Sequence, residues 1–204
     1  ISTVRKRISI GLQVMIRPRG GDFLYSDDEF EAMRHDIQTS KSLGADGIVL
    51  GVLLPDGRVD IEKTRQLVEL SHPIPVTFHR AFDLCPDLST ALEDVISTGA
   101  HRILTSGGEP SALAGAQSLA RLVQSSAGRI TILAGGGINP KNAREVVEKA
   151  GVRELHAGLR SITPSRVRGS GRNISPGGTG MDETQHFIVL QEDVEKLVEA
   201  LAER

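Results

Sequence analysis

The sequence has little of what marks a secreted, membrane-spanning or nucleic-acid-binding protein. Its single cysteine, Cys85, cannot form an internal disulfide. No run approaches the roughly 18 consecutive apolar residues of a membrane helix, and no charged-then-apolar leader precedes a cleavage site. The 24 Lys and Arg against 26 Asp and Glu leave a formal net charge of −2, too balanced to attract nucleic acid or anionic lipid. These absences predict a soluble protein of a reducing compartment that binds neither nucleic acid nor membrane.

Metal-binding motifs are scarce as well. The sequence contains no CxxC, no HxxxH and no dense cluster of Asp, Glu and His. Soft Cu(I) favours thiolate and thioether ligands, and only Cys85, Met15, Met33 and Met181 could supply them. Met15 and Met33 fall at strand and helix spacing, so we expect both in the core. The metal ligands therefore stay unassigned.

What the sequence does contain is a repeat. Short β-branched runs recur at roughly the 30-residue length of one βα unit, each followed by apolar residues at helical spacing. Their interiors are apolar on successive residues, which is typical of parallel strands covered by helices. The 204 residues fall short of the roughly 250 of a closed eight-unit barrel. We predict one α/β domain over residues 1–204, an incomplete TIM-type β/α barrel with strands at 13–16, 47–50, 75–78, 102–104, 130–134 and 154–157.

Helix signals fill the intervals between these runs. A Ser26 to Glu29 capping box predicts a helix that ends near residue 43, and Asn139 with Pro140 predicts an N-cap and first turn. The last helix places an apolar stripe against the sheet. The predicted helices cover 26–43, 60–71, 88–98, 111–127, 140–150 and 191–203, and residues 163–184 are predicted to form a long loop rich in Gly and Arg.

Polar residues gather after the strands. In a parallel barrel these strand ends form the mouth, where the sites of this fold lie. Arg17, Arg19 and Arg80 would bring three guanidinium groups to one rim, suited to bidentate contacts with a carboxylate or phosphate. The alternative is that they pair with Asp22, Asp83 and neighbouring acids.

Two glycine-rich strand ends add to the predicted ligand site. Gly135, Gly136 and Gly137 lead towards the helix expected after Asn139, so bare amides and a helix N-terminus would face a phosphate. This late position in the barrel is also where phosphate sites of the fold commonly lie. Ser106, after the fourth strand, is predicted as a further ligand residue. The alternative is that the glycines only allow tight turns.

Two histidines fall on strands. His79 lies near a strand end with Asp83 close in sequence, so the two are candidates for an acid and base pair that works near neutral pH. His156 is a weaker candidate of the same kind. The alternative for both is a core histidine with its hydrogen bonds satisfied.

The residues from Val14 to Ser26, with their Arg17-Pro18-Arg19-Gly20-Gly21-Asp22 centre, resemble the signature segment of the CutC family. Further matches lie at 44–47, 75–83, 102–107, 135–138 and 154–156. The resemblance implies a TIM-type barrel, a cytoplasmic setting, a homo-oligomer and a role in copper homeostasis, with Cu(I) as the candidate bound ion. It implies no established reaction. The alternative function is an enzyme or sensor that binds a small anionic ligand, a phosphate- or carboxylate-bearing metabolite, at the mouth.

The resemblance also implies two further βα units before this sequence, and the family's cysteines would lie in them. Residues 1–11 look like the tail of the second of these units. Cu(I) ligands therefore cannot be carried over onto numbered positions here. Without those units, the strands at Val14 and His156 would be unpaired edges. We expect aggregation or dependence on a partner when the chain is expressed as it stands.

Overall fold

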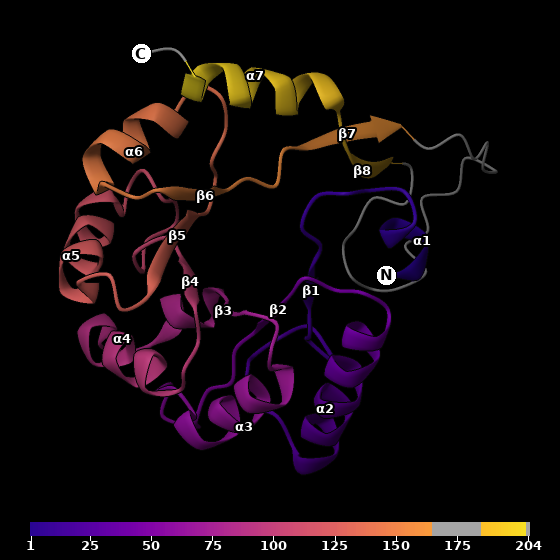
Figure 1. Cartoon of the computed structure of the whole chain (residues 1–204). Helices are drawn as coiled ribbons and strands as arrows, with labels where there is room; N and C mark the ends of the chain where they lie inside the picture. Colours follow the sequence, from indigo (N-terminus) through magenta and orange to yellow (C-terminus); the bar gives the residue numbers. More distant parts are fainter. Residues whose placement is uncertain (165–184, 203–204) are drawn as a thin grey trace, which may run out of the picture.

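The computed structural model describes residues 1–164 and 185–202. Six parallel strands form one sheet in sequence order, and the sheet curls so that the strands make an inner arc (Figure 1). All six predicted strands are confirmed to within about a residue. They are β1 (Gln13–Met15), β2 (Gly47–Leu50), β3 (Val76–Phe78), β4 (Arg102–Thr105), β5 (Thr131–Gly135) and β6 (Glu154–His156).

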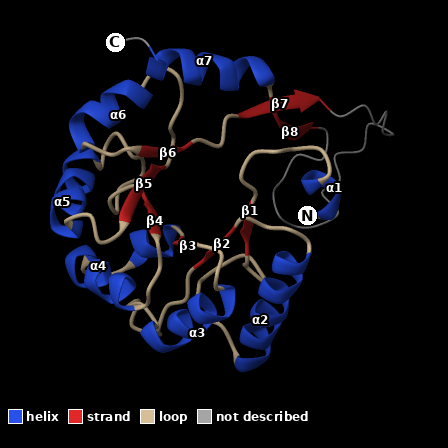
Figure 2. Cartoon of the chain, viewed as in Figure 1, coloured by secondary structure: helices blue, strands red, loops and turns tan. Residues whose placement is uncertain are grey.

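Long helices follow each of the first five strands and lie outside the arc (Figure 2). This is the arrangement of a curled, partial β/α barrel. The helices are α1 (Ser2–Arg5), α2 (Asp27–Ser42), α3 (Ile61–Ser71), the 3-10 helix η1 (Arg80–Leu84), α4 (Leu88–Ser97), α5 (Ala116–Ser126), α6 (Ala143–Ala150) and α7 (Gln191–Ala202). Ser26 and Glu29 form the expected capping box at the start of α2.

The two faces of the sheet differ in what they contact. Side chains that point outward pack against the helices and are fully buried, as for Ile48, Phe78 and Ile103. Inward-pointing side chains line a cavity of about 490 Å³, whose wall includes Gln13, Met15, Val49, Thr77, Arg102, Leu104, Leu133, Glu154 and His156. The hydrophobic core therefore lies between sheet and helices.

The predictions for the two methionines have different outcomes, because the residues lie on different sides of the sheet. Met33 is fully buried in the helix-side core, as expected. The core prediction for Met15 is wrong, because Met15 is 56% exposed and lies on the wall of the inner cavity. Strand spacing identified an inward position but could not show that the interior is open.

Several helix predictions are corrected. The helix expected from Pro140 begins at Ala143, since Asn139 and Asn142 first close a turn: the Lys141 amide donates to the Asn139 side chain at 3.0 Å, and the Asn139 amide donates to the Asn142 side chain at 2.9 Å. The helix expected from Ser111 begins at Ala116.

The last helix covers less of the core than expected. Within the apolar stripe of α7, Leu197 packs against the core, while Val194, Val198 and Leu201 are 41%, 60% and 41% exposed. The helix lies beside α6, where the Arg144 guanidinium donates to the Ala200 carbonyl at 2.8 Å. Its position leaves most of the stripe uncovered within the described part of the chain.

The sequence did not predict the antiparallel hairpin of β7 (Arg160–Pro164) and β8 (Gln185–Val189). The first two residues of the loop expected over 163–184 belong to β7, and the rest of that loop lies outside the described residues.

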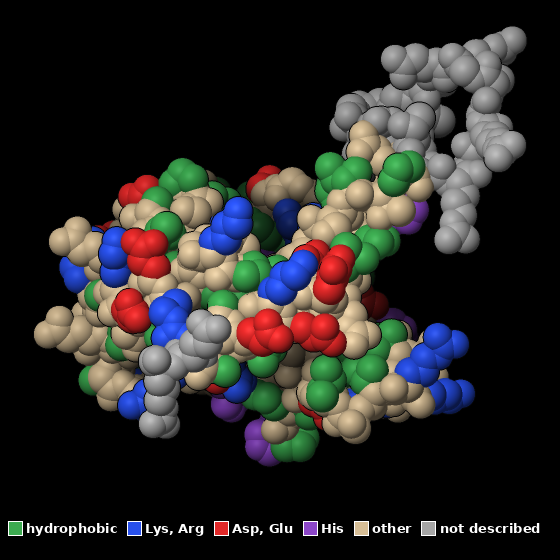
Figure 3. All heavy atoms as spheres, turned by 90° about the horizontal axis from the view of Figure 1, so that it is seen from above, with side chains coloured by type: hydrophobic (Ala, Val, Ile, Leu, Met, Phe, Trp, Pro, Cys, Tyr) green, Lys and Arg blue, Asp and Glu red, His purple; other side chains and the backbone are tan. Residues whose placement is uncertain are grey.

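No helix among residues 1–164 and 185–202 is long and apolar enough to cross a membrane. Seen from the α7 side, Lys, Arg, Asp and Glu side chains lie interspersed on the surface, without a broad field of one sign (Figure 3).

Candidate functional site

The turn after β3 is the centre of the candidate site at the barrel mouth. His79 follows the strand directly, and its amide donates to the Leu50 carbonyl at the end of β2 at 2.7 Å. The His79 imidazole then accepts a hydrogen bond from the amide of Ala81, so His79 is the N-cap of η1. This cap sends the next two polar side chains, Arg80 and Asp83, back over the mouth.

Arg80 joins three strand ends. Its Nε donates to Asp83 Oδ2 at 2.7 Å, and its Nη2 donates to the Ser106 hydroxyl at 2.8 Å. A Cβ built on Gly136, which follows β5, would lie 3.4 Å from Arg80 Nη1. The guanidinium therefore spans from β3 to β4 and β5. Its side chain is still 43% exposed, so one edge faces the mouth.

Asp83 holds the loop after β4 in place. Its side chain is only 7% exposed and accepts from the Ser106 amide at 3.0 Å, the Gly108 amide at 3.1 Å and the Thr105 hydroxyl. With Arg80 as a further donor, this carboxylate already occupies the nest of amides that an external anion would seek. The pairing of Arg80 with Asp83 is the one that the sequence offered as the alternative to a ligand-binding arginine.

The glycine run after β5 is shaped by close neighbours. Gly136 has φ +116, and a Cβ there would lie 3.2 Å from the Ser106 Cβ, so glycine lets the two loops meet. A Cβ on Gly135 would lie 2.5 Å from Leu104. The Gly137 carbonyl accepts from the Asn142 amide group at 2.8 Å. Because α6 starts only at Ala143, no helix N-terminus follows the run directly, which corrects that part of the expected phosphate site.

The two arginines after β1 have different surroundings. Arg19 donates to Glu29 at 2.6 Å, Asp22 at 2.9 Å and the Leu24 carbonyl at 2.7 Å, so its donors hold the loop to α2. Its hydrogen bond lowers the pKa of Asp22. The Arg17 guanidinium makes fewer hydrogen bonds than that of Arg19.

Arg17 lies on the side of the mouth nearest His79. Its Nη2 donates to the Gly21 carbonyl at 2.7 Å, and its guanidinium sits 4.6 Å from the centre of the Phe23 ring. The same ring packs on the His79 imidazole with 4.7 Å between ring centres. The structure thus groups Arg80, Asp83, Ser106 and Gly136, places Arg17 and His79 beside them, and assigns Arg19 to the loop.

His79 is neutral at physiological pH in this setting. The residue is 3% exposed, and burial lowers its pKa to about 4, with the nearby charge of Arg17 acting in the same direction. The near-neutral titration expected from the sequence is not found. The ring can donate and accept hydrogen bonds, but it does not take up a proton near pH 7.

The sulfur ligands do not form a copper site in the described part of the chain. Cys85 is buried, and burial raises the pKa of its thiol to about 11, so the thiolate that Cu(I) prefers is disfavoured. Met33 is enclosed in the core and Met15 stands alone on the cavity wall. Residues 1–164 and 185–202 hold no group of three or more His, Cys, Asp and Glu side chains that could bind a metal. Met181 lies outside the described residues.

Two functional positions escaped the sequence reasoning. Thr105 donates its hydroxyl to Asp83 and accepts from the Gly107 amide at 2.8 Å, so it fixes the loop after β4. Gly51 directly follows β2 and leaves room for His79. Both directly follow or end a predicted strand, so the same rule of strand ends could have found them.

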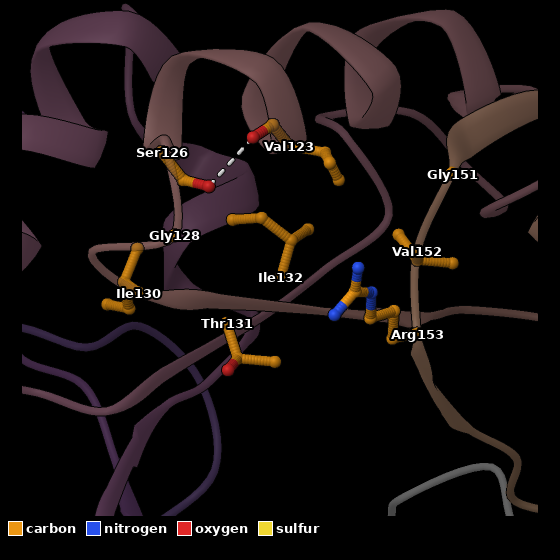
Figure 4. Close-up of a pocket in the computed structure, with 9 residues that line it drawn as sticks. All are labelled: Val123, Ser126, Gly128, Ile130, Thr131, Ile132, Gly151, Val152 and Arg153. Atoms are coloured by element: carbon orange, nitrogen blue, oxygen red, sulfur yellow. Dashed lines mark hydrogen bonds between the residues drawn. The ribbon is translucent and has the colours of Figure 1, made fainter.

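A second cavity, of about 410 Å³, lies at the opposite ends of the strands. Figure 4 shows it between the end of α5 and the starts of β5 and β6, with Arg153 on its wall and the Ser126 hydroxyl bonded to the Val123 carbonyl at 2.8 Å. None of the predicted site residues lines it.

The sequence of the chain is similar to those of proteins named CutC. A family protein CutC of Chromobacterium violaceum is 45% identical over 201 residues, which cover 98% of this chain and 81% of that protein. The human copper homeostasis protein cutC homolog is 42% identical over 88% of this chain, which spans 66% of the human protein's length.

Solved structures agree on the fold. A CutC protein of Streptococcus agalactiae is 31% identical, with a TM-score of 0.73 over 76% of this chain and 77% of that one. An aldolase, QR15, shares 18% identity, with a TM-score of 0.60 over 76% and 71% of the two chains, a likeness of fold alone. The model of the CutC family matches residues 1–161. The chain therefore belongs to the CutC family.

Proposed function

We propose that this protein takes part in copper homeostasis in the cytoplasm, as a homo-oligomer. The observation that carries the proposal is its 42% and 44% identity to human and mouse proteins named for copper homeostasis. Growth of cells that lack their own CutC protein, with and without added copper, tests the role. Restored copper tolerance supports it, and equal growth with an empty vector contradicts it.

Direct Cu(I) binding is the part of this proposal that the described donors fit least. A buried thiol with a raised pKa and two separated thioethers do not make a soft-metal site. Competition with a Cu(I) chelator measures binding by the chain as it stands. Uptake that survives Cys85→Ser would require ligands other than this thiol.

The geometry best supports a second activity, which is binding of a small phosphate or carboxylate at the mouth by Arg80. The guanidinium is held by Asp83 and Ser106, so its position is set before a ligand arrives. Its Nη1 lies against the Gly136 backbone, where a Cβ would come within 3.4 Å of it. A fixed, partly exposed guanidinium suits bidentate contact with an oxyanion.

Calorimetric titration with inorganic phosphate and with propionate tests this activity. We expect Arg80→Ala to weaken anion binding by about 2 kcal/mol, the usual effect of losing a hydrogen bond to a charged group. Arg153→Ala is the matched control, because Arg153 lies at the second cavity at the other strand ends. Equal losses in both variants, or no loss in Arg80→Ala, would contradict a site at the mouth.

A further inference from the structure

The imidazole of His79 carries a hydrogen-bond donor that nothing in the described chain uses. The Ala81 amide donates to His79 Nδ1 at 3.2 Å, so Nδ1 must be unprotonated. The proton of the neutral ring therefore sits on Nε2. That nitrogen is fully buried and has no hydrogen-bond partner within residues 1–164 and 185–202. Buried donors without partners are rare and costly, so this one calls for an explanation.

The ring is also held in one place. A Cβ on Gly51 would lie 2.6 Å from His79 Cε1 and Nδ1, so the end of β2 fits the bare imidazole and nothing larger. Phe23, from the loop after β1, packs on the ring with 4.7 Å between centres and screens it from solvent. The Phe23 carbonyl accepts from the Leu53 amide at 2.9 Å, which ties that loop to the end of β2.

His79 and Arg80 are neighbours in sequence whose side chains diverge. Arg80 reaches towards Ser106 and Gly136, and His79 lies against Gly51 and Phe23. Both side chains come from the same turn after β3, where the His79 imidazole caps η1 and Arg80 is its first residue. One group presents charge to the mouth, and the other presents a single N–H.

We propose that His79 Nε2 donates a hydrogen bond to an uncharged oxygen of the ligand whose anionic group contacts Arg80. This inference rests on the proposed anion site and narrows its ligand class. The ligand is a small phosphate or carboxylate that also bears a carbonyl or hydroxyl oxygen. The Phe23 ring turns aside to admit that oxygen.

The chemistry of the ring explains the choice of an uncharged oxygen. A neutral imidazole adds no positive charge, and burial keeps it neutral. A site that presents a buried donor rejects a ligand that lacks the matching acceptor, because the donor is then left unpaired. The mouth therefore favours anions that also carry a carbonyl or hydroxyl oxygen.

Paired probes test the inference on the full chain, at a concentration where light scattering shows a single species. Methyl phosphate is compared with glycolaldehyde phosphate, which adds a carbonyl, and propionate with pyruvate. We expect the wild type to bind the carbonyl member of each pair about tenfold more tightly, the effect of one added hydrogen bond. His79→Asn keeps an acceptor for the Ala81 amide but removes the distal donor, so it should bind both members equally. His79→Gln, whose amide nitrogen takes the place of Nε2, should recover part of the preference.

The outcomes separate the two proposals. Loss of the preference in His79→Asn, with partial recovery in His79→Gln, supports the donor role. A wild type that binds both members equally, through Arg80, overturns the donor role and leaves the anion site standing. No binding of any probe removes the anion site and the inference with it. Nitrogen chemical shifts of the labelled imidazole give an independent check, since protonation at Nδ1 in the free protein would overturn the assignment.

Discussion

Asp83 shows how one residue changes role between sequence and structure. Four residues after His79 in the sequence, it is a candidate acid or base. In the structure its carboxylate is nearly buried and accepts hydrogen bonds from Arg80, Thr105, Ser106 and Gly108. These contacts tie the carboxylate to Arg80 and to the loop after β4. We infer that Asp83 positions Arg80 and the loop after β4.

Loss of that carboxylate should be costly. We expect Asp83→Ala to lower the free energy of unfolding by about 3 kcal/mol, because buried amides and one edge of a guanidinium lose their acceptor. Urea denaturation followed by circular dichroism measures the change. Asp36→Ala, at an exposed position in α2, is the control and should change the same quantity by less than about 0.5 kcal/mol. A similar, small change in both variants would show that the Asp83 network contributes little.

Burial of His79 makes the free energy of unfolding depend on pH, and it falls as the pH falls. Its pKa is about 4 in the folded protein against an ordinary 6.5, so the unfolded chain takes up the proton first as the pH falls. The contribution is fully present above pH 6.5 and is lost as the pH falls towards 4, by about 3 kcal/mol in all.

The measurement is the difference between wild type and His79→Asn in urea unfolding at several pH values. The variant has no imidazole at this position, so its stability should fall less steeply between pH 6.5 and about 5. Parallel curves for the two proteins in that window would mean that His79 titrates normally. Carboxylates such as Asp22 and Glu29, whose pKa values are lowered by Arg19 and by the Ser26 amide, act mainly below this window.

Sequence reasoning placed the candidate residues at strand ends and named Asp22 and Asp83 as partners of the arginines, which the structure shows, but it missed their other contacts. The rule that strand ends form the mouth identified Arg17, His79, Arg80 and Ser106. It could not show that η1 turns Arg80 towards β4, or that Arg19 is used by Glu29. Such pairings depend on the path of the turns, which strand and helix periodicity does not encode.

Single elements were predicted with different success for a physical reason. Strands and helices that bury an apolar face appear clearly in the sequence, and all six barrel strands were found. The β7–β8 hairpin buries little, since Ile162 and Phe187 are 64% and 60% exposed, so its pattern is weak. The starts of α5 and α6 were misplaced because turns closed by side chains, such as Asn139 and Asn142, precede them.

The connection from β4 to α5 is the element that fixes the mouth most tightly. A Cβ on Gly115, the N-cap of α5, would lie 1.8 Å from the Ser106 carbonyl oxygen. Gly115 has φ −87, so only contact, not backbone conformation, requires glycine there. The helix start and Ser106 are thus in direct backbone contact.

We therefore expect Gly115→Ala to lower the free energy of unfolding by about 3 kcal/mol, because neither backbone can yield without moving α5 or the loop. Thermal and urea unfolding measure the loss. Gly20→Ala, where a Cβ would meet nothing within 4 Å, should have an effect below about 0.5 kcal/mol. If Gly115→Ala unfolds like Gly20→Ala, the close approach of α5 to Ser106 is not present in solution.

At the scale of the whole molecule, the sheet is curled but not closed. Within the described residues, β1 pairs only with β2 and β6 pairs only with β5. The interior is partly polar, with Arg102 Nε bonded to Glu154 at 2.7 Å across the cavity wall. Met15 adds an exposed apolar side chain beside one free edge. Free parallel edges next to apolar surface favour pairing with another chain.

We expect this chain, expressed as it stands, to associate in a concentration-dependent way, which light scattering coupled to gel filtration measures. Met15→Lys should reduce the association, because a charge beside the β1 edge opposes strand pairing. Leu84→Lys adds the same charge on η1, where Leu84 is 61% exposed, and should leave the association unchanged. Equal reduction by both variants would assign the effect to net charge. A monomer that melts cooperatively above about 50 °C, as intact domains do, would show that the open edges do not drive association.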